Sequence, residues 1–239
     1  MTPSSNKAHR SRTSLRALLV ALLGVGVLSA CQPEPTPLTV DLVGDSITMQ
    51  AHWNRDSEFR RAGVGLASKY DLVVDAWLGN KFQDVQKAQS ARVFDSKRPR
   101  PSVLVIALGL NNADPYYGGG GWTKEDETAF KKLLNTPHPS SCVVVVLPAA
   151  GKGAPQQYRD HAVFASARMK TFASQRPRTV MVDWAPVIKA HPEYLRADGK
   201  HLADNKLAKP DQMANPVPAD AYASLIWSGV AKCPPPPSK

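Results

Sequence analysis

Ser46 is the first residue of this chain whose surroundings suggest chemistry. It lies in a Gly44-Asp45-Ser46 sequence that directly follows a run of apolar and β-branched residues. In open α/β sheets, ligands bind at the carboxyl ends of the strands. A serine at a strand-to-helix turn presents its hydroxyl beside the N–H groups of the helix start, which suits a nucleophile. Asp and Ser are also preferred helix N-caps, so the tripeptide alone leaves a structural role open.

A serine nucleophile needs a general base, and the base needs a group that orients it. Of the six histidines, His201 has a carboxylate, Asp198, three residues before it, and Gly199 permits a tight turn between them. Such a turn brings the carboxylate and the imidazole to one edge of a loop. We therefore predict His201 as the base and Asp198 as its orienting partner, with His52 and His191 as the next candidates for the base.

The third requirement is a set of donors for the oxyanion of a tetrahedral intermediate. The backbone N–H groups of Ser46 and Gly79 and the side-chain amide of Asn111 are the candidates, because Gly79 and Asn111 follow the second and third apolar runs. Taken singly, each is also an ordinary turn residue. No group of Cys and His has the spacing of metal ligands, so we expect neither a metal nor another cofactor.

Five short, nearly continuous apolar runs must position these residues. Such runs are typical of strands buried on both faces of a parallel sheet. The runs are Leu38 to Val43, Leu72 to Ala76, Val103 to Leu108, Cys142 to Leu147 and Thr179 to Asp183. Helix-length segments follow them, at 53–69, 82–90, 124–135, 158–175 and 219–230. This alternation predicts an α/β fold, a doubly wound three-layer α/β/α sandwich.

Two segments interrupt the alternation. Residues 116–122 contain four consecutive glycines, 118–121, after the third strand, and either a mobile lid or a plain flexible loop fits them. Residues 205–218 are rich in Pro, Asn and Lys and precede the last helix.

The four blocks together resemble those of the SGNH hydrolase superfamily of GDSL-like lipases and esterases, which supply Ser, Gly, Asn and His in this order. Here they are Gly44-Asp45-Ser46, Gly79, Gly109-Leu110-Asn111 and Asp198-Gly199-Lys200-His201, within about residues 39–226. The resemblance implies a five-stranded parallel sheet of flavodoxin-like order and hydrolysis of esters or thioesters through an acyl-enzyme. Leu110 replaces the Thr that is usual in the third block, and Asn112 stands where Asp is frequent.

The first thirty residues read as a secretion signal. Four basic residues within the first sixteen precede an apolar run, Ala17 to Leu28, which is shorter than the roughly twenty residues of a membrane span. The run ends in Leu28-Ser29-Ala30-Cys31, which resembles the bacterial lipobox, whose Cys receives a diacylglyceryl group. We expect a signal peptide at 1–30, a linker at 31–37, a hydrolase domain at 38–233 and a Pro-rich tail at 234–239. An ordinary signal peptide with a chance Cys, or an uncleaved anchor, remains open.

Charge and export together limit the partners. The net charge is +10, but the basic residues are scattered, which argues against a nucleic-acid partner. We expect an exported protein, lipid-anchored at the extracytoplasmic face of the cell membrane, that acts on an ester-bearing small molecule, glycan or lipid. An O-acyltransferase and a non-catalytic binding lipoprotein of the same fold are the alternatives.

Two cysteines remain once Cys31 is assigned to lipid. Cys142 begins the fourth predicted strand, and Cys233 follows a last helix that should run antiparallel to the strands and end at the same edge. An oxidising compartment allows such a pair to close, so we predict a disulfide between them. A buried Cys142 and a free Cys233 is the alternative.

Overall fold

The computed structural model describes residues 38–53, 59, 70–85, 101–115, 121–203 and 217–235. These residues belong to Pro37–Lys239, one of the two units into which the chain divides. The expected signal peptide, Cys31 and the linker lie outside the described residues. So do 116–120 of the glycine-rich segment and 204–216 before the last helix.

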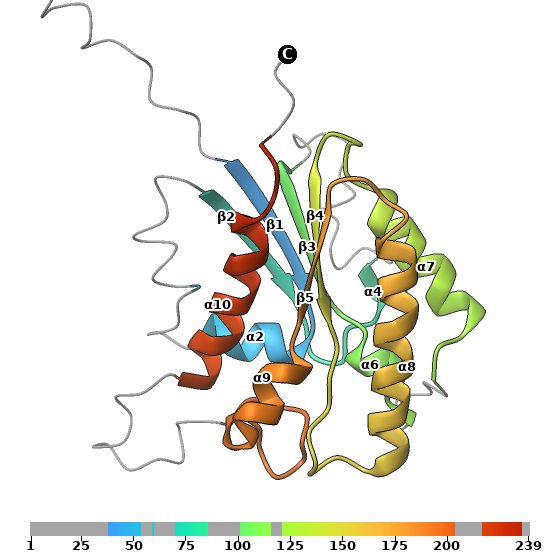
Figure 1. Ribbon diagram of the computed structural model, residues 1–239, viewed down its shortest axis with the longest axis vertical. Helices are drawn as coiled ribbons and strands as arrows, with labels where there is room; N and C mark the ends of the chain where they lie inside the picture. The colour runs from blue at the N-terminus through green and yellow to red at the C-terminus, as the bar shows by residue number, and fades with distance from the viewer. Residues whose placement is uncertain are drawn as a thin grey trace, which may run out of the picture. The chain divides into compact units, whose positions relative to one another are not determined.

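The sheet has five parallel strands in the order β2-β1-β3-β4-β5 (Figure 1). This is the flavodoxin-like order, so the predicted fold class is confirmed. β1 lies between β2 and β3, and their carboxyl ends therefore flank the residues that follow β1. The strands are β1 (Leu38–Gly44), β2 (Tyr70–Ala76), β3 (Val103–Ala107), β4 (Cys142–Leu147) and β5 (Thr179–Asp183).

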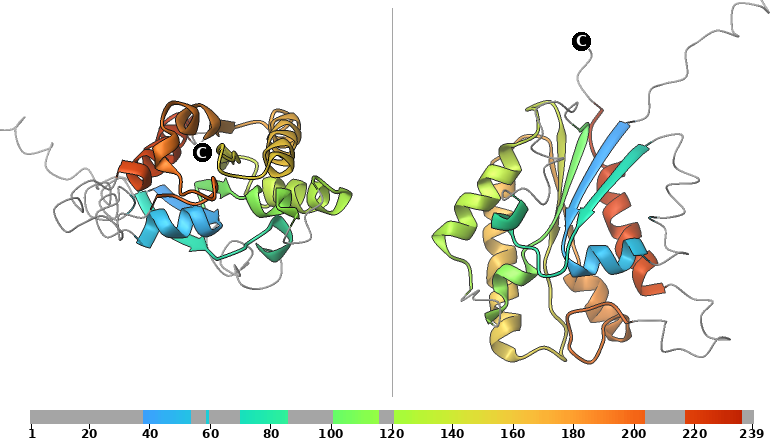
Figure 2. Two further views of the ribbon diagram at one scale, coloured as in Figure 1. Left: turned by 90° about the horizontal axis from the view of Figure 1, so that it is seen from below. Right: turned by 180° about the vertical axis from the view of Figure 1, so that it is seen from behind.

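Helices cover both faces of the sheet (Figures 1 and 2). One face carries α2 (Ser46–Trp53), α9 (Ala185–Ala190) and α10 (Val217–Ala231). The other carries α4 (Phe82–Val85), α7 (Lys124–Asn135) and α8 (Gln156–Ala173), and the short α6 (Leu110–Ala113) packs against α8. A 3-10 helix, η2, spans Pro192–Tyr194. No helix in the described part of the chain combines the length and the apolar character needed to cross a membrane.

The start of α2 differs from the sequence prediction, which placed the first helix at 53–69. The helix begins at Ser46, because the Asp45 carboxylate accepts the Ile47 N–H at 3.0 Å and so acts as the N-cap. Of the predicted segment, 54–58 and 60–69 lie outside the described residues. The short helices α6 and α9 were not predicted, since fewer than two turns carry no readable 3.6-residue period.

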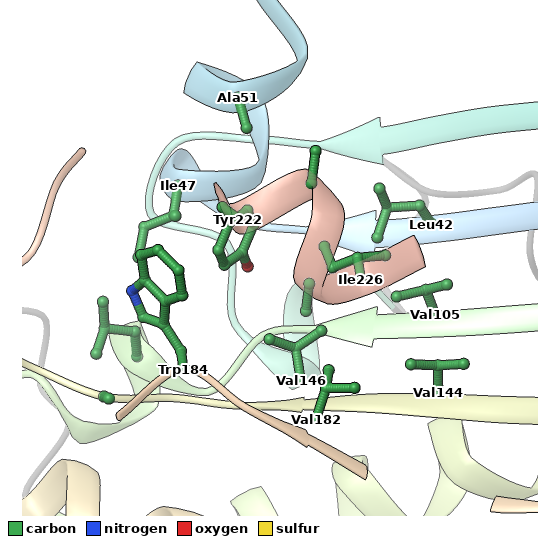
Figure 3. Packing of buried hydrophobic residues seen from close by; sticks show 14 of the residues in the cluster. Leu42, Ile47, Ala51, Val105, Val144, Val146, Val182, Trp184, Tyr222 and Ile226 are labelled. Carbon is green, nitrogen blue, oxygen red and sulfur yellow. The ribbon is translucent and has the colours of Figure 1, made fainter. Parts of the chain in front are cut away.

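Side chains of the central strands alternate between two apolar clusters. Val105 and Val144 pack with residues of α2 and α10, whereas Ile106 and Val145 pack with residues of α4, α7 and α8. Figure 3 shows the first cluster. Both faces of β3 and β4 are therefore buried, which explains why these runs are continuously apolar.

α10 runs antiparallel to the strands and ends beside the edge at which they begin (Figure 1). This brings Cys142, the first residue of β4, to Cys233, with their Cα atoms 5.8 Å apart and their sulfurs at disulfide distance, 1.96 Å. The guanidinium of Arg178 donates hydrogen bonds to the carbonyl oxygens of Pro234 and Pro235, at 2.6 and 3.0 Å. The start of the Pro-rich tail is thus hydrogen-bonded to the domain.

Candidate active site

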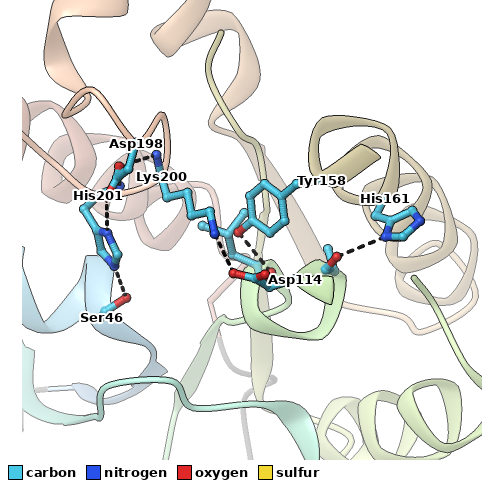
Figure 4. Close-up of polar contacts among 9 residues, drawn as sticks. Ser46, Asp114, Tyr158, His161, Asp198, Lys200 and His201 are labelled. Atoms are coloured by element: carbon cyan, nitrogen blue, oxygen red, sulfur yellow. Dashed lines mark hydrogen bonds and ion pairs between the residues drawn. The ribbon is translucent and has the colours of Figure 1, made fainter. Parts of the chain in front are cut away.

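Ser46, His201 and Asp198 form a linear hydrogen-bonded relay at the carboxyl edge of the sheet (Figure 4). Nε2 of His201 lies 3.1 Å from Oγ of Ser46, and Nδ1 of His201 lies 2.7 Å from Oδ2 of Asp198. A carboxylate can only accept, so Nδ1 carries the proton and Nε2 is left to accept the serine proton. The geometry is that of a nucleophile, a general base and an orienting carboxylate.

The surroundings of Asp198 favour its ionised form. Partial burial acts to raise the pKa of this carboxyl, but hydrogen bonds from the His201 ring and from the backbone N–H groups of Lys200 and His201 outweigh it. The pKa therefore lies below its usual value. A charged Asp198 can stabilise the imidazolium that forms when His201 takes a proton.

Asp45, the residue before the serine, has the opposite environment. It is fully buried, and burial raises its pKa to about 6, although the Ile47 N–H and the nearby His201 act to lower it. The Asp45 carboxyl lines a cavity of about 20 Å³ together with Trp184 and Tyr222. This is about the volume that one water molecule needs.

Helix α2 contributes the nucleophile and also contacts the loop that carries His201. Its first residue is Ser46, whose N–H is not needed for an intrahelical bond. One turn later, Oε1 of Gln50 accepts the N–H of Leu202, the residue after His201, at 3.1 Å. Helix α2 therefore carries the nucleophile and also helps to hold the loop of the base.

The loop that carries His201 is a closed turn. An isolated bridge joins Leu195 to Leu202, and the N–H of Arg196 donates to the carbonyl of His201 at 2.9 Å. Gly199 at its tip has a φ of 65°, and a Cβ there would overlap the backbone of Ala154. Glycine is therefore required at this position both by conformation and by space.

A buried ion pair fastens this loop to α6. Nζ of Lys200 lies 2.6 Å from Oδ2 of Asp114, with side chains that are 18% and 2% exposed. The same ammonium lies 4.3 Å from the centre of the Tyr158 ring, whose hydroxyl donates to the carbonyl of Leu110 (Figure 4). Lys200 thus connects the loop with the base to the helix that contains Asn111.

The expected oxyanion donors flank the serine on two sides. Gly79 lies in the turn after β2 with a φ of 70°. The next residue, Asn80, donates its side-chain amide to the carbonyl of Gly44 at 3.0 Å and accepts the Asn111 amide on its own carbonyl at 3.1 Å. These bonds tie both donor segments to the strand end that leads into Ser46. The Asn111 amide keeps a second N–H for a ligand.

Asn112 has a different role from its neighbour. Its oxygen accepts the N–H of Phe82 at 3.3 Å, and its amide donates to Gln83 and to Asp126. Asn112 therefore joins α6 to α4 and α7. The Asn that stands where Asp is frequent in the SGNH blocks thus makes contacts between helices.

The other candidate bases do not take part in this relay. His191 pairs with Glu193 at 3.0 Å and stacks on Tyr194. His52 belongs to α2 and lines a groove discussed below. Within the residues that the structure describes, no group of three or more His, Cys, Asp or Glu could hold a metal ion.

Four positioning residues of the site were not predicted. Gln50, Asn80, Asp114 and Lys200 act through hydrogen bonds or an ion pair to residues distant in sequence. Only the direct adjacency of Asn80 to Gly79 and of Lys200 to His201 was a signal for any of them.

Solved structures share this fold. The C-terminal catalytic domain of peptidoglycan O-acetyltransferase A from Streptococcus pneumoniae matches with a TM-score of 0.60 at 21% identity, over 85% of this chain and 99% of that one. A mutant of an acetyl-xylooligosaccharide esterase from Geobacillus matches with a TM-score of 0.61 at 16% identity, over 83% of this chain and 96% of that one. The psychrotrophic esterase EstA from Pseudoalteromonas matches with a TM-score of 0.56 at 13% identity, over 81% of this chain and 99% of that one. No protein-family model and no curated protein matches the chain.

Proposed function

We propose that this protein is a serine ester hydrolase that removes acyl or acetyl groups from envelope glycans or lipids. The observation that carries the proposal is the hydrogen-bonded relay from Ser46 through His201 to Asp198. Nε2 of His201 lies 3.1 Å from Oγ of Ser46, and Nδ1 lies 2.7 Å from Oδ2 of Asp198. The fold, shared with acetyl esterases and an O-acetyltransferase domain, supports it.

In this mechanism Oγ of Ser46 attacks the carbonyl carbon of the ester while Nε2 of His201 takes the hydroxyl proton. The tetrahedral oxyanion accepts hydrogen bonds from the backbone of Ser46 and Gly79 and from Asn111. Each such donor is worth roughly 3 kcal/mol of barrier in other hydrolases. The C–O bond of the ester then breaks, and the alcohol leaves with the proton from His201. Water repeats the sequence on the acyl-serine and releases the acid.

The test is hydrolysis of a panel of short- and long-chain esters, combined with labelling by a fluorophosphonate probe. Ser46→Ala and His201→Ala should each lower kcat by several orders of magnitude, and the double variant should be little worse than either, because the residues act as a unit. Asp198→Asn should cost less. Full activity and labelling of Ser46→Ala would contradict the proposal. A parent protein that never reacts would point to a binding lipoprotein instead.

An O-acyltransferase is the second candidate. The His201 and Asp198 side chains are 32% and 42% exposed, so a sugar hydroxyl can approach the acyl-serine where water would. The likeness to the peptidoglycan O-acetyltransferase domain also favours acyl transfer. Transfer of acetyl from a donor ester to an added glycan, with suppressed hydrolysis, would establish it.

We also propose export and lipidation of Cys31, which place the site outside the membrane. Cys31→Ser should abolish lipid attachment and release the protein from membranes or leave an unprocessed precursor. The measurement is the intact mass of envelope-purified protein, and a mass without lipid on Cys31 would refute the anchor.

A further inference from the structure

A second hollow lies between α2 and the loop that follows β2. Its volume of about 570 Å³ falls within the range of about 300–1,000 Å³ that is usual for ligand pockets. We call it the tryptophan groove. Its lining residues are Met49, His52, Trp53, Val74, Ala76, Trp77 and Leu78.

The groove exposes three large apolar side chains. Trp53, Trp77 and Leu78 are 62%, 50% and 72% exposed. Nε1 of Trp77 donates to Oδ1 of Asp75 at 2.8 Å, so its indole is held in place. Exposed apolar side chains that form one patch often mark a binding surface, whereas singly scattered ones do not.

Both walls of the groove lead along the chain to residues of the candidate active site. The loop that presents Trp77 and Leu78 continues into Gly79, the expected oxyanion donor, and the N–H of Trp77 donates to the carbonyl of Gly44 at 3.3 Å. On the other wall, α2 runs from Ser46 to Trp53, a distance of roughly 10 Å at the helical rise. A substrate that spans both walls must therefore extend well beyond the ester that Ser46 attacks.

We propose that the tryptophan groove binds the sugar rings of an acylated oligosaccharide, with the ester at Ser46. This inference rests on the proposed function. Indoles that are half exposed present flat apolar faces against which sugar rings can pack, while the ring hydroxyls keep their contact with water. A fatty acyl chain gains its binding energy by leaving water on most of its surface, which favours an enclosed cavity, whereas this groove is open to solvent.

The test compares O-acetylated xylo- and chito-oligosaccharides with 4-nitrophenyl acetate, using the full chain. The parent should prefer the oligosaccharides in kcat/KM. Trp53→Ala and Trp77→Ala should each reduce that preference about tenfold, mainly through KM, which corresponds to the loss of one aromatic contact. Phe164→Ala is the matched control, because Phe164 is 54% exposed on α8, and it should leave the preference unchanged.

Binding of oligosaccharides without any ester group, measured by calorimetry, separates this inference from the proposed function. Binding that weakens in Trp53→Ala supports the groove even if the parent hydrolyses nothing. The inference is overturned if the parent binds no oligosaccharide, or if all three variants behave alike. It is also overturned if the tryptophan variants lose only activity on long-chain acyl esters, which would assign the groove to a lipid chain.

Discussion

Asp45 and Asp198 are two carboxyl groups of one site whose environments shift their pKa values in opposite directions. Asp198 is partly exposed and accepts three hydrogen bonds, so it remains ionised. Asp45 is enclosed by protein, and its pKa is raised. The role of Asp198 could be predicted from the sequence, because Asp198 lies only three residues before His201. The environment of Asp45 could not, since the groups that bury it come from other elements, such as Trp184 and Tyr222.

We predict that Asp45→Asn changes how stability depends on pH. In the parent, the folded state holds the Asp45 proton up to about pH 6, whereas the unfolded chain releases it near 3.8. The contribution of Asp45 to stability therefore falls as pH rises through that window, by roughly 3 kcal/mol in total, and is constant above it. Asn keeps an oxygen for the Ile47 N–H and carries no charge, so it should lack this fall.

The measurement is the free energy of unfolding by denaturant at several pH values from 4 to 8. The difference between Asp45→Asn and the parent should grow in favour of Asn between pH 4 and 6 and then level off. Asp71→Asn, an exposed position on β2, is the control. A difference that does not depend on pH would contradict the prediction.

At the scale of elements, short loops rather than the long helices determine the site geometry. The sequence pattern located all five strands and the segments of α7, α8 and α10, because buried strands are continuously apolar and helix-length segments separate them. It did not reveal how the His201 loop is held. The contacts of Lys200 with Asp114 and of Leu202 with Gln50 join residues 86 and 152 positions apart, and no local pattern encodes them.

We expect Lys200→Met to impair both the loop and catalysis. It leaves the Asp114 carboxylate buried without its ammonium partner, and breaking a buried pair in this way typically costs about 3–5 kcal/mol. If the fold survives, kcat should fall about tenfold with KM little changed, because the base is displaced rather than the substrate. Lys200→Arg should retain most of the activity.

A double-mutant cycle with Asp114→Asn measures the pair itself. The coupling in unfolding free energy should lie in the range of about 0.5–3 kcal/mol found for contacting residues. The control is Lys170→Met, which removes an exposed pair with Asp183 and should change stability by no more than about 0.5 kcal/mol. A coupling near zero would mean that the loop is held by its other contacts.

At the scale of the domain, the Cys142–Cys233 pair and the candidate active site lie at opposite edges of the sheet. The alternation of apolar runs and helical segments sufficed to predict the layers, since right-handed crossovers leave few arrangements for parallel strands. The same argument placed Cys142 and Cys233 at one edge, and their sulfurs lie at bonding distance.

We predict that a chain beginning at Pro33 has a Cys142–Cys233 disulfide when prepared under oxidising conditions. Closing a loop of 91 residues stabilises a fold by roughly 4–5 kcal/mol in the chain-entropy model, which is an upper figure. Reduction should therefore lower Tm and leave ester hydrolysis at moderate temperature nearly unchanged. Two free thiols in the denatured, unreduced chain would exclude the bond, and activity lost before structure would contradict its position.

The order of the strands also determines when the site can first exist. Ser46 follows β1, the first strand to be synthesised, whereas His201 arrives only after β5, on the far edge of the sheet. Every strand pairing is parallel, so each must wait for a crossover, which makes such folds slow to form. A chain that is still emerging therefore carries the segment of the nucleophile before the segment of the base. Under the proposed function, ester hydrolysis would require that the whole sheet has formed.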